Sequence, residues 1–69
     1  MLIYVRLLNE GTEVLRPGEA VEVRAGVFKI LAPDGYESSD EEWELPPGSE
    51  VRVESRTSHE KTYLMAIRA

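Results

Sequence analysis

The sequence predicts a single small all-β domain over residues 1–69, built as a five-stranded, strongly bent antiparallel sheet or an SH3-like barrel. Several short runs alternate apolar and polar residues, which is the period of a half-buried strand. Glycine, proline and asparagine separate these runs at short intervals. A chain of 69 residues is also too short for the two full sheets of a sandwich. A flat meander that dimerises through an edge strand is the alternative architecture.

The first predicted strand covers residues 2–8, where Ile3, Val5 and Leu7 share one face. The run at 9–12, NEGT, is a turn signal, and residues 13–17 form a short extended piece. Pro17-Gly18 then predicts a type II turn, because proline presets φ at the first central position and glycine accepts positive φ at the second.

The strongest hairpin signal lies at 20–31. Residues 20–24 place Val21 and Val23 on one face, and residues 27–31 form the partner strand. Ala25-Gly26 supplies the two-residue connection that is typical of a tight β-hairpin.

The second half of the chain predicts two further strands. APDG at 32–35 is a type I turn signal, and PPGS at 46–49 is another turn, with Pro47-Gly48 at its centre. Residues 50–55 alternate again, and 61–69 form the last strand beyond a polar hairpin tip at 57–60.

The acidic stretch at 37–48 has two structural interpretations. Ser39 and Glu42 have the spacing of a helix capping box, which favours a short helical turn near 39–45. Pro46 and Pro47 would end such a helix almost at once, so a short strand around Trp43 is the alternative.

Negative charge is concentrated in the same stretch. The chain carries 8 basic and 13 acidic residues, a net charge of −5. Five of the acids lie together with no basic residue among them: Glu37, Asp40, Glu41, Glu42 and Glu44. Nucleic acid is therefore not an expected partner, since phosphate binding needs a positive surface. A basic protein or peptide fits this charge better.

Trp43, the only tryptophan, has a core interpretation and an interface interpretation. A tryptophan gains most from burial with its N–H satisfied, and Leu45 would share its face in a strand. Alternatively, acids around an aromatic ring attract cationic groups at a binding surface. We prefer the core interpretation but keep the residue in the predicted binding site, whose members are Tyr36, Glu37, Asp40, Glu41, Glu42, Trp43 and Glu44.

Two runs resemble a set of short bacterial proteins with no assigned activity. These are VRLLNEGTEVLRP at 5–17 and DEEWELPPGSEVR at 40–52, together with the tyrosine- and lysine-bearing last strand. The resemblance covers most of the chain. It implies a small β fold and no function, because none is attached to the set.

The DEEW run at 40–43 also looks similar to the acids beside tryptophan in SH3 domains that bind proline-rich peptides. The chain departs from that pattern, because the paired aromatics at the chain start are missing. The likeness is architectural and implies no peptide binding, since a shared fold does not confer function.

Residue types that carry catalysis or metal binding are scarce. The only histidine, His59, lies in a predicted loop tip beside Ser58, without a third group to orient it. There is no cysteine, the acids lack calcium-loop spacing, and the five glycines stand in separate turns rather than in a phosphate loop. We therefore expect no enzymatic activity, no cofactor and no specific metal site.

Targeting signals are not evident either. No apolar run approaches the roughly 20 residues of a membrane span, and the first residues are typical of a strand rather than a signal peptide. The sequence predicts a cytoplasmic protein with no membrane partner.

These observations favour a non-enzymatic protein-binding module that presents an acidic and aromatic face to a basic partner. The alternative is a structural or assembly protein stabilised by homodimerisation. That alternative is motivated by the small core expected of such a chain and by the apolar run YLMAI at 63–67.

Overall fold

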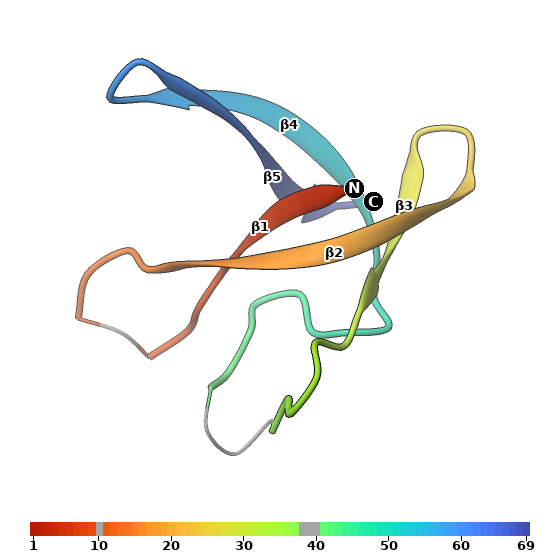
Figure 1. The fold of residues 1–69 in the computed structure, drawn as a ribbon, viewed down its shortest axis with the longest axis horizontal. Helices are drawn as coiled ribbons and strands as arrows, with labels where there is room; N and C mark the ends of the chain where they lie inside the picture. Colours follow the sequence, from red (N-terminus) through yellow and green to blue (C-terminus); the bar gives the residue numbers. More distant parts are fainter. Residues whose placement is uncertain (10, 38–40) are drawn as a thin grey trace.

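The computed structural model describes residues 1–9, 11–37 and 41–69, and in these ranges it contains strands and no helix. The strands are β1 (Leu2–Arg6), β2 (Leu15–Arg24), β3 (Val27–Leu31), β4 (Glu50–Ser58) and β5 (Lys61–Arg68). They form one strongly bent sheet that closes on itself in chain order (Figure 1). The predicted all-β class with five strands is confirmed.

The ring closes between the first and the last strand. Consecutive strands pair antiparallel, whereas β1 and β5 pair parallel where Tyr4 lies opposite Met65. This parallel contact follows from the odd number of strands, because a ring of five alternating directions must bring two equal directions together once. The sheet is therefore not a flat, open meander.

The β2–β3 hairpin forms where the sequence predicts it. Ala25-Gly26 connects the two strands, and Gly26 has a φ of 76°. The register shifts between Glu22 and Arg24, so that Val23 is the extra residue of a β-bulge. Bulges increase the local twist of a strand pair, which helps a five-stranded sheet to curl into a closed ring.

The β4–β5 hairpin is the longest in the protein. Its register runs from Val51 opposite Arg68 to Ser58 opposite Lys61. His59 and Glu60 alone form the tip, with φ values of 51° and 65°. In Figure 1 this hairpin curves away from the rest of the sheet.

The turn predicted at Pro17-Gly18 is wrong, because β2 continues through both residues. β2 pairs with β1 over this region, with Pro17 opposite Tyr4, whereas its pairing with β3 begins only at Glu19. Pro17 thus lies where β2 has a neighbour on one side. At such a position the missing N–H of proline need not interrupt a ladder.

The helical turn predicted near 39–45 is also wrong for its described part. Residues 41–45 are not helical, and Trp43 forms an isolated antiparallel bridge with Leu7. The alternative of an extended segment around Trp43 is nearer to the structure. Ser39 and Asp40 lie outside the described residues, and so does the proposed capping box.

The core lies inside the ring, and the buried residues that the structure describes are all apolar. Its main cluster consists of Ile3, Val5, Ala20, Ile30, Trp43, Leu45, Val51 and Ala66. The inner face of β2 carries small residues, Gly18 and Ala20, and the Trp43 ring packs against Gly18. Val21 is exposed on the other face, because side chains alternate along a strand and its neighbour Ala20 points into the core. Val23, the extra residue of the bulge, is exposed as well.

Candidate functional site

The acidic segment, meaning the described residues 41–44 of the acidic stretch, lies beside the end of β1. The connections β1–β2 and β3–β4 extend to the same, lower side of Figure 1. Leu8 N donates to Glu42 O at 2.7 Å, and Glu44 N donates to Arg6 O at 2.9 Å. These bonds flank the bridge between Leu7 and Trp43, so the chain path around the predicted site is determined by backbone pairing.

Trp43 belongs to the core, with only 3% of its surface exposed. Its indole Nε1 donates to Oε1 of Glu41 at 2.8 Å, which satisfies the polar end of the ring. The Tyr36 ring packs edge-on against it, with centroids 5.3 Å apart and planes at 73°. Tyr36 is half-buried, so it is the aromatic ring through which this cluster reaches the surface.

Two of the predicted acids, Glu41 and Glu42, form side-chain hydrogen bonds to other segments of the chain. The same Oε1 of Glu41 that bonds Trp43 also accepts from Nε of Arg16 on β2, at 3.1 Å. The side-chain amide of Asn9 donates to Glu42. Glu41 thus connects the acidic segment to β2, and Glu42 connects it to the β1–β2 connection.

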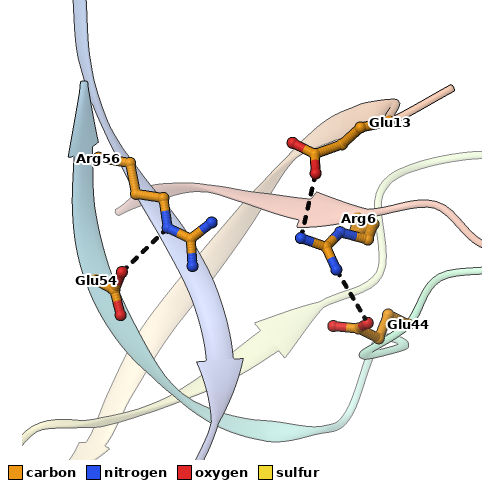
Figure 2. Close-up of polar contacts among 5 residues, drawn as sticks. All are labelled: Arg6, Glu13, Glu44, Glu54 and Arg56. Atoms are coloured by element: carbon orange, nitrogen blue, oxygen red, sulfur yellow. Dashed lines mark hydrogen bonds and ion pairs between the residues drawn. The ribbon is translucent and has the colours of Figure 1, made fainter. Parts of the chain in front are cut away.

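Arg6 on β1 forms ion pairs with two acidic side chains, shown in Figure 2. Its guanidinium lies between Glu13, at 3.2 Å, and Glu44, at 3.8 Å. These side chains are partly exposed, so each pair contributes little, about 0–1 kcal/mol. Glu44, like Glu41 and Glu42, nevertheless has an intramolecular partner.

A cleft of about 180 Å³ opens beside Tyr36. It is lined by Arg16, Pro33, Asp34, Gly35, Tyr36, Glu37 and Glu41. The carboxylates of Asp34 and Glu37 lie on exposed residues, and within the described part of the chain neither has a hydrogen-bond or ion-pair partner. Among the described residues, the cleft therefore carries two carboxylates without a partner, next to the ring of Tyr36.

The residues of the predicted site do not all lie at the cleft. Tyr36, Glu37 and Glu41 line the cleft, whereas Trp43 is buried behind it. Glu42 and Glu44 do not line the cleft, and Asp40 falls outside the described residues.

Four lining residues lie outside the predicted site, and two of them, Asp34 and Arg16, are charged. Asp34 belongs to a turn in which Tyr36 N donates to Pro33 O, so this turn spans 33–36, one residue later than the predicted turn at 32–35. The position of Asp34 two residues before Tyr36 was an available signal. No local signal identified Arg16, because it lies on β2, whereas the other lining residues lie in the connection between β3 and β4.

In residues 1–9, 11–37 and 41–69, no group of three His, Asp or Glu side chains could hold a metal ion. His59 lies at the exposed tip of the β4–β5 hairpin. Across these same ranges, no helix has the length and apolarity needed to cross a membrane.

Comparison with protein-family models, curated proteins and solved structures found no match to this chain. The likeness to short bacterial proteins and to SH3 domains stays a prediction.

Proposed function

We propose that this protein is a non-enzymatic binding module, which receives a lysine or arginine side chain of a basic protein or peptide in the cleft beside Tyr36. The observation that supports this most directly is the pair of carboxylates in the cleft beside Tyr36, those of Asp34 and Glu37, which have no partner in the described part of the chain. A cation there gains from both carboxylates and from the face of the tyrosine ring.

The size of the cleft favours a side chain over a small molecule. Sites for drug-sized ligands usually enclose about 300–1,000 Å³. At about 180 Å³, this cleft suits one long side chain of a larger partner. Contacts outside the cleft would then supply the remaining interface.

Arg16 increases the expected preference of the cleft for a cationic over an anionic partner. Its Nε is engaged by Glu41 at 3.1 Å, so it neutralises that carboxylate and leaves Asp34 and Glu37 to the partner. An acidic ligand would meet the two free carboxylates and be repelled, because like charges brought together oppose binding.

The test is an NMR titration of the isotope-labelled protein with a short lysine- and arginine-containing peptide. We expect shifts in the amide signals of 34–37 and in the indole signal of Trp43, because the Tyr36 ring packs on that indole. Raising the salt concentration should weaken binding, since the Debye length falls to about 8 Å at 0.15 M ionic strength.

The double substitution Asp34→Asn and Glu37→Gln should weaken peptide binding about threefold to tenfold. The control is Glu54→Gln with Glu60→Gln, which removes the same charge from the β4–β5 hairpin together with the partly exposed ion pair between Arg56 and Glu54. Equal weakening by both variants would reduce the effect to net charge alone. Shifts confined to residues away from the cleft would contradict the proposed site.

A further inference from the structure

An apolar surface lies on the outside of the sheet, over β1, β2 and β3. Leu2, Val21 and Leu31 are 55%, 47% and 38% exposed. Side chains alternate along a strand, so the burial of their neighbours Ile3, Ala20 and Ile30 turns these three outward. Leu2 and Leu31 lie on either side of Glu19 in the cross-strand register, so the three residues are neighbours on one face.

Four of the outward residues on β2 and β3 form a block with a distinctive charge pattern. Glu19 lies opposite Leu31, and Val21 lies opposite Lys29. One diagonal of this block is therefore apolar, Val21 to Leu31, and the other joins a negative to a positive charge. Lys29 has no ion pair among the described residues, whereas Oε1 of Glu19 accepts from the amino group of Met1 at 3.0 Å. Among those residues the other oxygen of Glu19, Oε2, has no partner and can accept from a second lysine.

We propose that this face binds a second copy of the same chain through a two-fold axis that lies in the plane of the interface, along the apolar diagonal. The block measures about 5 Å across the strands and about 7 Å along them, so it is close to square. Rotation about the Val21–Leu31 diagonal places each of these residues against its own copy. The same rotation brings Glu19 of each protomer onto Lys29 of the other.

This self-complementarity is what an isologous interface requires, because each patch must satisfy its own copy. A foreign partner would have to supply the same pattern of apolar and charged groups. The pattern itself therefore points to a second copy. None of these four residues lines the cleft beside Tyr36, so the inference does not depend on the proposed function.

The area of the face sets the expected strength of the dimer. Stable interfaces bury about 800 Å² per partner, whereas the whole protein exposes 4718 Å². Three strands spaced about 4.8 Å apart cover less than a standard interface. We therefore expect a dimer that dissociates on dilution, rather than a permanent one.

The apolar last strand is not this interface. Met65 and Ala66 are buried, and Tyr63, Leu64 and Ile67 are half-buried in the same sheet. The run YLMAI at 63–67, which suggested homodimerisation from the sequence, therefore packs within the protein. The exposed apolar residues Leu2, Val21 and Leu31 lie on the outer face of β1–β3 instead.

Sedimentation equilibrium over a range of concentrations tests the proposal with the full chain. Glu19→Lys and Lys29→Glu should each raise the dimer dissociation constant about tenfold, because each substitution acts at both symmetric contacts. The double variant carrying both substitutions should restore dimerisation to within about threefold of the original chain. Lys61→Glu, at the exposed start of β5, is the control and should leave the dissociation constant unchanged.

Circular dichroism melting of each variant checks that the fold is intact, and Leu31→Ser provides an uncharged variant that should also weaken the dimer. A monomer at every concentration up to about 1 mM overturns the proposal. It is also overturned by a dimer that neither charge reversal weakens, or that the double variant does not restore.

Discussion

The indole nitrogen of Trp43 and the carboxylate of Glu41 lie 2.8 Å apart, and the nitrogen donates a hydrogen bond to Oε1. The same oxygen accepts from Arg16 Nε at 3.1 Å. Glu41 thus joins a core aromatic residue to strand β2. A residue that belongs to an acidic surface stretch in the sequence therefore also supports the core.

Trp43→Ala should destabilise the protein by about 3–5 kcal/mol, since it removes the largest buried side chain and leaves a cavity. Native domains have only about 5–15 kcal/mol of stability, so this loss is a large fraction of the total. Urea unfolding followed by circular dichroism measures it. Trp43→Phe keeps most of the packing and should cost less, about 1–2 kcal/mol. A fold that tolerates the alanine without loss would contradict the core position of the ring.

Glu41→Ala should cost about 1–3 kcal/mol, because it leaves the indole N–H of Trp43 without its partner in a partly buried position. Glu37→Ala is the matched control. Glu37 is exposed and unpaired within the described residues, so its removal should change stability by less than about 0.5 kcal/mol. Equal effects of the two substitutions on the urea midpoint would show that the Glu41 bonds contribute nothing.

Period-two alternation and turn chemistry predicted the elements that depend on local forces. The hairpin at 20–31 and the turn at Pro47-Gly48 are examples, the latter with a Gly48 φ of 94° and a bond from Ser49 N to Pro46 O. Local chemistry misled at Pro17-Gly18, where pairing with β1 and contact with Trp43 keep the chain extended. The helical turn near 39–45 failed for a similar reason, because Trp43 pairs with Leu7 instead.

The candidate site was predictable only in part, because it is assembled from distant segments. The residues near Tyr36 form a local group that charge and aromatic content revealed. Which acids are free depends on cations elsewhere: Arg16 engages Glu41, and Arg6 lies beside Glu44. Those pairings arise from sheet register, which single-sequence patterns do not specify.

Gly18→Ala should be neutral or stabilise the protein by about 0.4–1 kcal/mol. Gly18 does not have positive φ, and an added Cβ would lie 3.6 Å from the Trp43 ring, which is ordinary van der Waals contact. Gly18→Leu should cost about 1–3 kcal/mol, because the longer side chain meets the same ring. Thermal melting compares the two variants. A loss above about 1 kcal/mol for the alanine would mean that the strand and the indole are closer than the structure places them.

The tip of the β4–β5 hairpin should be the easiest place to stabilise the protein. His59 and Glu60 have φ values of 51° and 65°, and positive φ at both central residues is the signature of a type I′ turn. Left-handed torsions cost residues other than glycine and asparagine about 1–2 kcal/mol each. His59→Asn combined with Glu60→Gly should therefore raise stability by about 1 kcal/mol.

Gly26→Ala is the opposite change at the β2–β3 hairpin and serves as the comparison. Its φ is 76° and its added Cβ would lie 3.2 Å from Nη1 of Arg52, so we expect a loss of about 1–2 kcal/mol. Urea midpoints of the three proteins decide the matter. If the tip variant is no more stable than the original chain while Gly26→Ala is clearly weaker, the β4–β5 tip does not hold the left-handed turn described here.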